Sequence, residues 1–388
     1  MGATPAVAVT MVAGARTAVR PVDGELAGWN PVVLAGVVGR EVLERAGLDA
    51  GVLDEVVVGC CDPVGAAGAD VARAIVLAAG WPVSIGGSVV DRGETSGAAA
   101  VQAAVAAIRA GQARTVLVVG LGLCSVVPPG AAALNRTYGA PWGGVAERFE
   151  EVGGLLPAPR LSERAAQAAG IGRADLDAAA EESRRRRAEA ETSPAIVAVA
   201  ARPGDAAGRG MYRGDPVATD VVRDWGDAAE LPPAFDDDGL LTAATFAPPA
   251  DCVTAVLLQA GFEAQAPDGT TTMAGMGRAA GDPFDPVGNV AVTVGRALDD
   301  AGVELAAVEA ISVVEHDAAT ALLVARALDI DAERINRDGG AVATGNAGAA
   351  EELRVITDGL AVTGGQRLLL TISAGPTGSA TIVWQTDI

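Results

Sequence analysis

Residues 38–59 read VGREVLERAGLDAGVLDEVVVG, and residues 294–314 repeat their pattern as VGRALDDAGVELAAVEAISVV. Each stretch predicts an amphipathic helix that ends at Ala-Gly, then a short acidic turn and a β-branched strand. The similarity continues downstream, where AGQARTVLVVGLG (110–122) corresponds to TGGQRLLLTISAG (363–375), a helix end and turn followed by a buried strand. The sequence therefore predicts a duplicated α/β unit. We expect two similar, mostly parallel sheets that are covered by helices and related by a pseudo-two-fold axis.

A different kind of sequence separates the two copies, at about 123–240. It contains Pro-rich turns, a charged helix EESRRRRAEA (181–190) and the acidic loop FDDDG (235–239). Such a long excursion is typical of a lid or a surface subdomain. We therefore expect an N-terminal half at 1–258 that includes this insertion, and a C-terminal half at 259–388. The arginines at 184–187 are either a solvated helix face or a contact to phosphate oxygens.

Composition narrows the possible functions. The formal net charge of −21 argues against nucleic acid or an anionic membrane as a partner, because both need a basic face. No N-terminal signal is visible and no apolar run reaches membrane-spanning length, so we expect a cytoplasmic protein. Cys60, Cys61, Cys124 and Cys252 match no zinc spacing, so we expect no metal site and interpret them as small buried hydrophobes.

The chain has a single histidine, His316, so any mechanism that pairs a cysteine or serine with a histidine must use it. It lies between Glu315 and Asp317, which are able to orient an imidazole. The alternative is an ordinary structural histidine that follows a buried strand.

The stretch VVDRGETSGAAAV (89–101) predicts a strand, a tight turn and the start of a small-residue helix. Unpaired backbone N–H groups at a helix N-terminus stabilise anions, so such a turn is a favoured place for a nucleophile. Glu94 stands at its tip. It is a candidate general base, or a carboxylate that caps the helix or pairs with Arg92.

Five ordered motifs resemble those of the thiolase superfamily over nearly the whole chain. ARTAV (15–19) is similar to the family's opening R-T-P-I, and 89–101 resembles its nucleophile turn V-N-R-x-C-G-S-G-x-x-A-V. The stretch 157–190 resembles the family's loop domain, and 235–258 resembles the region that carries N-A-S-G-x-N-D-G-A. INRDGGAVATGNAG (335–348) resembles N-x-N-G-G-A-I-A-L-G-H-P-x-G. The resemblance implies an α/β thiolase-like fold of two duplicated, five-layered α-β-α-β-α halves, with a loop subdomain inserted in the first half.

The resemblance also implies where the reactive groups stand. Thiolases use a cysteine nucleophile, a histidine that deprotonates it and a second cysteine that moves a proton at the substrate α-carbon. By position, Glu94 replaces the nucleophile, Asn346 the histidine and Ser373 the second cysteine. His316, in VEHD (314–317), either falls inside the N-E-A-F motif or matches the H-D variant of the sterol-carrier type. Glu94 and His316 are the one acid/base pair that the composition permits.

The substrate channel also differs from the family pattern. Thr245, Phe246, Ala247 and Pro248 stand where the family has N-A-S-G beside the acyl-CoA. Phe246 and the two prolines that follow Ala247 are expected to narrow the channel if their side chains point inward. A further set completes the candidate substrate-binding residues: Arg184, Arg187 and Gly375.

These replacements predict a thiolase-like protein without Claisen or thiolysis activity, which binds an acyl-CoA or related acyl thioester, or a protein partner. The alternative is an acyl-transfer, hydrolytic or decarboxylating enzyme with altered chemistry, in which Glu94 is the general base. A third hypothesis is a structural subunit. We expect a homodimer, or a heteromer with a thiolase-related or accessory protein, paired near 87–91. The only cofactor-like group expected is the CoA moiety of the ligand.

Overall fold

The computed structural model describes residues 7–134, 139, 143–152, 156–201, 215–261, 271–362, 368–376 and 378–386. The Gly/Gln turn of the second repeat, at 363–367, lies outside the described residues. The strands are β1 (Val9–Arg16), β2 (Arg20–Pro21), β3 (Glu55–Gly59), β4 (Gly86–Val90), β5 (Thr115–Leu123), β6 (Val199–Ala200), β7 (Pro216–Val217), β8 (Ala250–Ala260), β9 (Thr271–Ala279), β10 (Ala310–Val313), β11 (Leu368–Gly375) and β12 (Gly378–Thr386). The α-helices are α1 (Pro31–Ala46), α2 (Val71–Ala78), α3 (Ser96–Arg109), α4 (Ala131–Leu134), α5 (Ala158–Ala168), α6 (Arg173–Glu189), α7 (Val290–Ala301), α8 (Ala318–Leu328), α9 (Ala341–Thr344) and α10 (Ala349–Val362).

The main sheet has the strand order β10-β11-β12-β9-β1-β8-β5-β3-β4, with β2 paired to β8. The two expected sheets are joined through β1 and β9, which pair at Thr10–Thr272 and Met11–Thr271 among the described residues. The expectation of mostly parallel strands is wrong. The repeated helix–strand units supply the parallel pairs β3–β4, β3–β5 and β10–β11, whereas β1, β8, β9 and β12 join them antiparallel.

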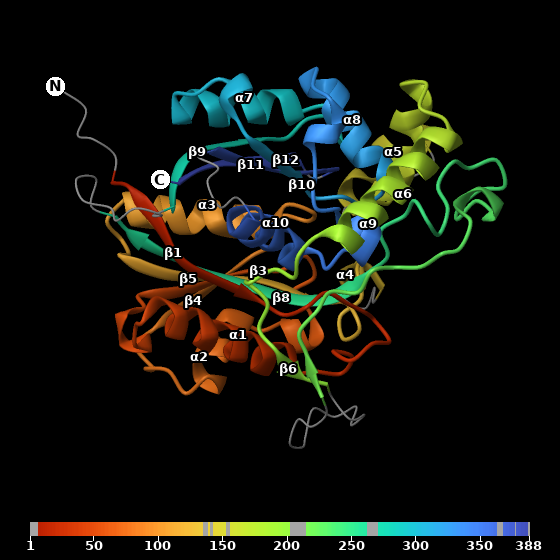
Figure 1. Cartoon of the computed structure of the whole chain (residues 1–388). Helices are drawn as coiled ribbons and strands as arrows, with labels where there is room; N and C mark the ends of the chain where they lie inside the picture. Colours follow the sequence, from red (N-terminus) through yellow and green to blue (C-terminus); the bar gives the residue numbers. More distant parts are fainter. Residues whose placement is uncertain are drawn as a thin grey trace.

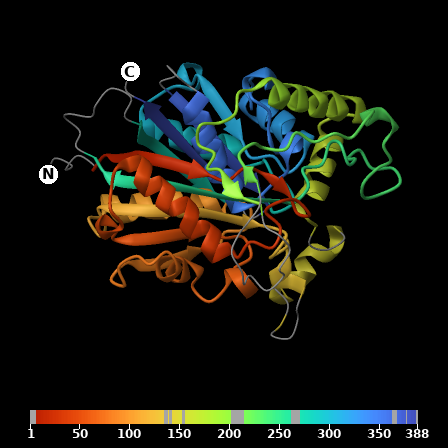
Figure 2. The same ribbon diagram turned by 60° about the horizontal axis from the view of Figure 1, so that its bottom comes forward.

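Five layers are stacked in the molecule, and the two halves form them together (Figure 1). Helices α1 and α2 cover the outer face of the sheet of the first half. Helices α3 and α10 lie between the two sheet layers, and α7 and α8 cover the other outer face. This arrangement confirms the predicted α/β thiolase-like fold class. Helices α5 and α6 of the insertion lie at one end of the sheets (Figure 2).

The ends of the repeated helices follow from the sequence. Helix α1 ends at Gly47, which has φ 64° and donates its N–H to the carbonyl of Glu44, and α7 ends at Gly302 with φ 67°. Glycine adopts this left-handed conformation without steric cost, so it closes a helix at C′. Both Ala-Gly helix ends were predicted by the repeat, and the structure confirms them.

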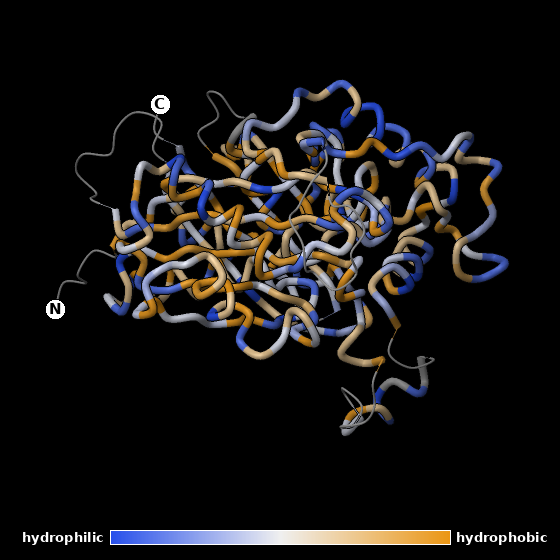
Figure 3. Tube along the Cα trace, turned by 90° about the horizontal axis from the view of Figure 1, so that it is seen from below, coloured by the Kyte–Doolittle hydropathy of each residue, from blue (hydrophilic) through white to orange (hydrophobic). Residues whose placement is uncertain are grey.

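The central helical layer can pack closely because β5 carries glycines that face it. A Cβ on Gly122 would collide with the backbone of Ala347, just before α10 begins. The apolar residues between the layers include Val118, Leu353 and Trp384, all fully buried. Figure 3 shows the apolar segments gathered in the body of the molecule formed by the sheets. Close backbone approach and apolar burial therefore fix the start of α10 against β5.

A buried ion cluster attaches the inserted region to both halves. Arg16, at the end of β1, is completely buried and donates to the carboxylates of Asp220 and Asp358. Asp220 belongs to the insertion and Asp358 to α10. The proposed half boundary at 258 falls within β8 and stays a prediction. Among the described residues, no helix has the length and apolarity needed to cross a membrane.

Candidate active site

A cavity of about 910 Å³ opens where the two halves and the insertion meet. Its apolar walls come from β5, the end of the insertion and the segment before β8. The polar and reactive side chains that line it are Cys60, Cys61, Asp62, Asp91, Arg92, Glu94, Cys124, His316 and Asn346. Five of the candidate residues from the sequence therefore meet in one space: Glu94, Phe246, Ala247, His316 and Asn346.

The turn before α3 is held rigidly by its own side chains. The Ser96 hydroxyl accepts the N–H of Arg92 at 2.8 Å and donates to the carbonyl of Gly93 at 2.7 Å. Thr95 donates its hydroxyl to the carbonyl of Arg92 at 3.1 Å. Gly93 has φ 54°, which lets the chain turn sharply and place Glu94 against the cavity.

Ser373 and Gly375 lie behind Glu94 rather than in the cavity lining. The Ser373 hydroxyl is 3.0 Å from the carbonyl oxygen of Glu94 and also hydrogen-bonds the carboxyl of Glu352. An ideal Cβ on Gly375 would lie 2.9 Å from the Cβ of Glu94. Gly375 is therefore in van der Waals range of the Glu94 side chain, and Ser373 links this turn to β11.

Glu352 is a buried carboxyl that the sequence reasoning missed. One oxygen accepts the N–H groups of Gly97 and Ala98 in the first turn of α3, and the other accepts the Ser373 hydroxyl. Burial raises the pKa of Glu352 to about 8, although these hydrogen bonds oppose the shift. A carboxyl with this pKa exchanges a proton near neutral pH. The signal in the sequence is an acidic pair, 351–352, in the first turn of a helix that is rich in apolar residues.

His316 and Asn346 are neighbours on the C-terminal side of the cavity. The Nε2 of His316 lies 3.1 Å from the carbonyl oxygen of Ala374, and a carbonyl accepts only, so Nε2 carries the proton. The other ring nitrogen, Nδ1, lies 3.5 Å from the amide nitrogen of Asn346. That amide also donates to the carbonyl of Glu315 at 2.8 Å. Asn346 thus helps to fix the orientation of the imidazole.

Three of the cysteines line the cavity, which differs from their interpretation as plain core residues. Cys60 and Cys124 are 4% and 8% exposed, whereas Cys61 is only partly buried. Cys252 is completely buried and contacts the carbonyl of Thr17. Burial raises the pKa of Cys60 to about 11 and that of Cys124 to about 12. The sequence pattern did not reveal that two adjacent cysteines lie at the end of a strand beside the cavity.

The predicted channel residues lie partly in the cavity. Phe246 lines it and packs edge-on against Phe235, with ring centroids 5.8 Å apart. Ala247 also lines it. Thr245 is completely buried, and its hydroxyl accepts the N–H of Thr242 at 2.8 Å. The two phenylalanine rings therefore restrict the cavity on the side of the insertion.

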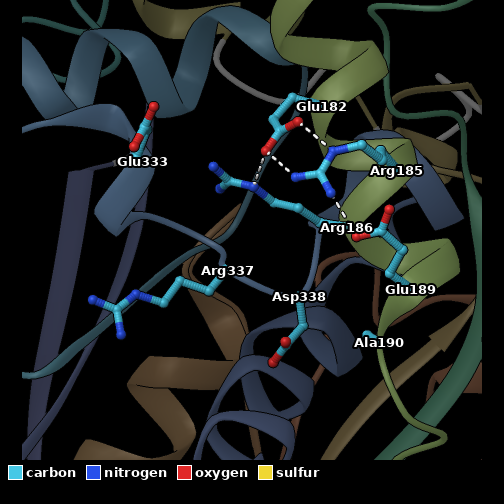
Figure 4. Close-up of a pocket in the computed structure, with 8 residues that line it drawn as sticks. All are labelled: Glu182, Arg185, Arg186, Glu189, Ala190, Glu333, Arg337 and Asp338. Carbon is cyan, nitrogen blue, oxygen red and sulfur yellow. Dashed lines mark hydrogen bonds and ion pairs between the residues drawn. The ribbon is translucent and has the colours of Figure 1, made fainter.

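Arg184 and Arg187 are outside this cavity. Arg184 pairs with Glu181 at 2.8 Å and stacks over Trp225, and Arg187 donates to the carbonyl of Glu191. The neighbouring Arg185 and Arg186 border a separate surface hollow of about 540 Å³, where both pair with Glu182 (Figure 4). Carboxylates on the same helix thus neutralise much of this basic run, and a phosphate contact there stays a prediction.

The model of the N-terminal thiolase domain matches residues 9–261, and that of the C-terminal thiolase domain matches residues 269–385. The chain belongs to the thiolase family, and hence to the acyltransferase superfamily. It is 32% identical to an acetyl-CoA acetyltransferase of Pseudomonas aeruginosa, covering 90% of this chain and 91% of the relative. It is 30% identical to a 3-ketoacyl-CoA thiolase of Bacillus subtilis, covering 87% and 88%. The solved structure of an acetyl-CoA acetyltransferase from Syntrophomonas wolfei superposes with a TM-score of 0.83 at 25% identity, covering 99% of this chain and all of that one.

These relatives correct the functional prediction. The expectation of a thiolase-like protein without thiolase activity, or with a different chemistry based on Glu94, is wrong, because relatives over most of the chain are named as thiolases and acetyltransferases. The prediction relied on residue types at three aligned positions. It did not consider that the fold brings other reactive groups, Cys61 among them, into the same cavity.

Proposed function

We propose that the protein catalyses the thiolase reaction, the transfer of an acyl group between a CoA thioester and an acceptor. The acceptor is CoA in thiolysis of a 3-ketoacyl-CoA, and a second acyl-CoA in the reverse condensation. One observation carries the proposal. Thiol, carboxyl and imidazole groups from both thiolase halves converge on a single cavity of about 910 Å³.

His316 is the proposed acid/base group at the substrate. It is the only histidine in the chain, and its Nε2 proton is engaged with the Ala374 carbonyl. Its Nδ1 lies 3.5 Å from the amide nitrogen of Asn346, and we propose that this ring nitrogen exchanges the proton with the substrate. The backbone of Glu315 takes part in this arrangement, because its carbonyl accepts the Asn346 amide at 2.8 Å.

The cavity lining suits a short acyl group with the pantetheine arm of CoA. Leu121, Leu123, Val127 and Val314 supply apolar surface, and the Phe235–Phe246 pair limits the length of the acyl group. We propose acetyl-CoA and short 3-ketoacyl-CoAs as the substrates. The names of the similar proteins, acetyl-CoA acetyltransferase and 3-ketoacyl-CoA thiolase, support this class.

The test is thiolysis of acetoacetyl-CoA by CoA, followed by loss of the absorbance of its enolate. We expect turnover by the native protein and a loss of roughly 10²–10⁴-fold in kcat for His316→Gln, the usual contribution of a general acid or base. Arg185→Ala is the matched control, because this side chain is exposed and lies outside the cavity. Absence of turnover with a panel of 3-ketoacyl-CoAs of increasing chain length would refute the proposal.

Two further expectations accompany this function. CoA or acetyl-CoA should raise the melting temperature if either one occupies the cavity, since a ligand that binds only the folded state stabilises it. We also propose a cytoplasmic dimer that pairs near 87–91. The edge position of β4 in the sheet supports this, and light scattering measures it.

A further inference from the structure

We propose that Cys61 is the residue that carries the acyl group, as a thioester, between the two half-reactions. The inference rests on the proposed thiolase function and identifies its nucleophile. Of the chain's four cysteines, which all lie in the described part, Cys60, Cys124 and Cys252 are nearly or completely buried and Cys61 alone is partly exposed. Cys61 also lines the cavity with Glu94, His316 and Asn346.

The surroundings of the thiol suit a reaction that develops negative charge. An ideal Cβ on Gly348 would lie 3.4 Å from the Sγ of Cys61, and Gly348 immediately precedes α10. Cys61 also hydrogen-bonds the side chain of Ser96, the first residue of α3. Two helices of 14 residues each therefore begin beside this sulfur. Helix N-termini favour a thiolate or an oxyanion in their vicinity.

Gly348 itself leaves room at the thiol. It has φ 55°, a left-handed conformation in which side chains are strained, and its N–H is held by the Asn346 side chain at 2.7 Å. A side chain at this position would therefore be strained and would also contact the sulfur. The glycine at the end of G-N-A-G (345–348) thus leaves room beside the sulfur of Cys61.

The thiol is held in its protonated form until substrate arrives. Burial and the charge of Glu352 raise the pKa of Cys61 well above its usual value. The hydrogen bond between Cys61 and the Ser96 side chain opposes this rise in the pKa of the thiol. Attack on a thioester therefore needs a base, and His316, the proposed acid/base group, lines the same cavity as Cys61.

The step balances as a simple thioester exchange. The Cys61 thiol gives its proton to Nδ1 of His316, the proposed acid/base group of the same cavity, while its sulfur forms a bond to the acyl carbon. The bond from that carbon to the CoA sulfur then breaks with its electron pair, and the departing CoA takes the proton back from His316. The products are the acyl-Cys61 thioester and CoA with a free thiol. The same acyl group on Glu94 would be a mixed anhydride, which hydrolyses far more readily.

The experiment is to incubate the native full-length protein with acetyl-CoA, quench with acid, and measure the intact mass and the modified peptide. We expect the mass of one acetyl group on the peptide that contains Cys61, and its removal by added CoA. In a separate reaction, iodoacetamide should alkylate Cys61 in the native protein. Incubation with acetyl-CoA beforehand should protect Cys61 from this alkylation. The variant Cys61→Ser should lose the stable acyl-enzyme and at least roughly 100-fold in kcat, while the control Cys252→Ser should retain both.

The outcomes separate this inference from the function on which it rests. Turnover of acetoacetyl-CoA with the acetyl group on another residue, or with full activity in Cys61→Ser, overturns the role of Cys61 and leaves the thiolase function standing. Absence of both turnover and acetylation overturns both proposals. If Cys61→Ser does not fold, peptide mapping and protection in the native protein still decide the matter, because neither measurement needs a variant.

Discussion

Replacing Arg16 by methionine should destabilise the protein more than the loss of an exposed ion pair does. All five guanidinium N–H groups of Arg16 are used: one on the carbonyl of Thr17, two on Asp220 and two on Asp358, at 2.7–3.0 Å. The side chain is completely buried. Methionine fills a similar volume but leaves two buried carboxylates without their main partner.

The magnitude follows from what each carboxylate retains. Asp358 keeps Arg354 at 3.0 Å and the Ser193 hydroxyl at 2.7 Å. Within the described part of the chain, Asp220 keeps the N–H of Val19 at 2.8 Å and Arg187 at 3.9 Å. Removing one partner of a buried pair costs about 3–5 kcal/mol, and we expect a loss in this range, mostly from Asp220.

Urea unfolding followed by tryptophan fluorescence measures this loss. Glu41→Gln is the control, because the Glu41–Arg45 pair is partly exposed and worth at most about 1 kcal/mol. Against the opposing effect of burial, the charge of Arg16 lowers the pKa of Asp220 to about 2. The ionised Asp220 therefore stabilises the fold above pH 3.8, and this contribution is lost as the pH falls toward 2. The difference in free energy of unfolding between the native protein and the variant should therefore shrink over that pH range. A loss below about 1 kcal/mol at neutral pH would refute the reasoning.

Three further changes test other parts of the structure. Burial raises the pKa of Glu352 from 4.5 to about 8, so between these pH values the folded protein holds a proton that the unfolded chain releases. The free energy of unfolding should therefore fall as the pH rises from 4.5 to 8. In urea titrations, Glu352→Gln should make the free energy of unfolding less dependent on pH over this range. Gly122→Val should lower the free energy of unfolding by at least about 1–3 kcal/mol, because the new side chain collides with the Ala347 backbone. Gly295→Ala, in open space within α7, should raise the free energy of unfolding by about 0.5–1 kcal/mol. Equal melting temperatures of the two variants would contradict this. Phe246→Ala should raise kcat/KM for longer 3-ketoacyl-CoAs relative to acetoacetyl-CoA, by about tenfold per methylene accommodated, and an unchanged chain-length profile would exclude Phe246 as a wall.

The sequence predicted the elements of the fold better than their assembly. The helix ends at Gly47 and Gly302 were readable because glycine at C′ is a local signal. The buried strand at 115–123 was readable because its apolar run is continuous. The link between β1 and β9 was not, since pairing between Thr10 and Thr272 depends on backbone geometry that no side-chain pattern records.

The candidate site was predictable only in part, for a similar reason. Glu94, His316 and Asn346 lie at the ends of strands or in turns, where the repeat and the motifs fix their positions, and the fold brings them to one cavity. Cys61 and Glu352 were missed. An apolar neighbourhood in the sequence does not distinguish a thiol in the core from one at the rim of a cavity, nor a buried carboxyl from an exposed one on the same helix.

The central layer formed by α3 and α10 has a consequence for the origin of the chain. Helix α10 comes from the second half, yet it packs on β5 and β8 of the first, while α3 of the first half reaches β12 of the second. Neither half covers the inner face of its own sheet without a helix from the other. A single ancestral unit, before the gene duplicated, therefore had to associate with a second copy of itself to bury that surface. Residues 9–261 expressed alone should accordingly aggregate or self-associate rather than fold as a monomer.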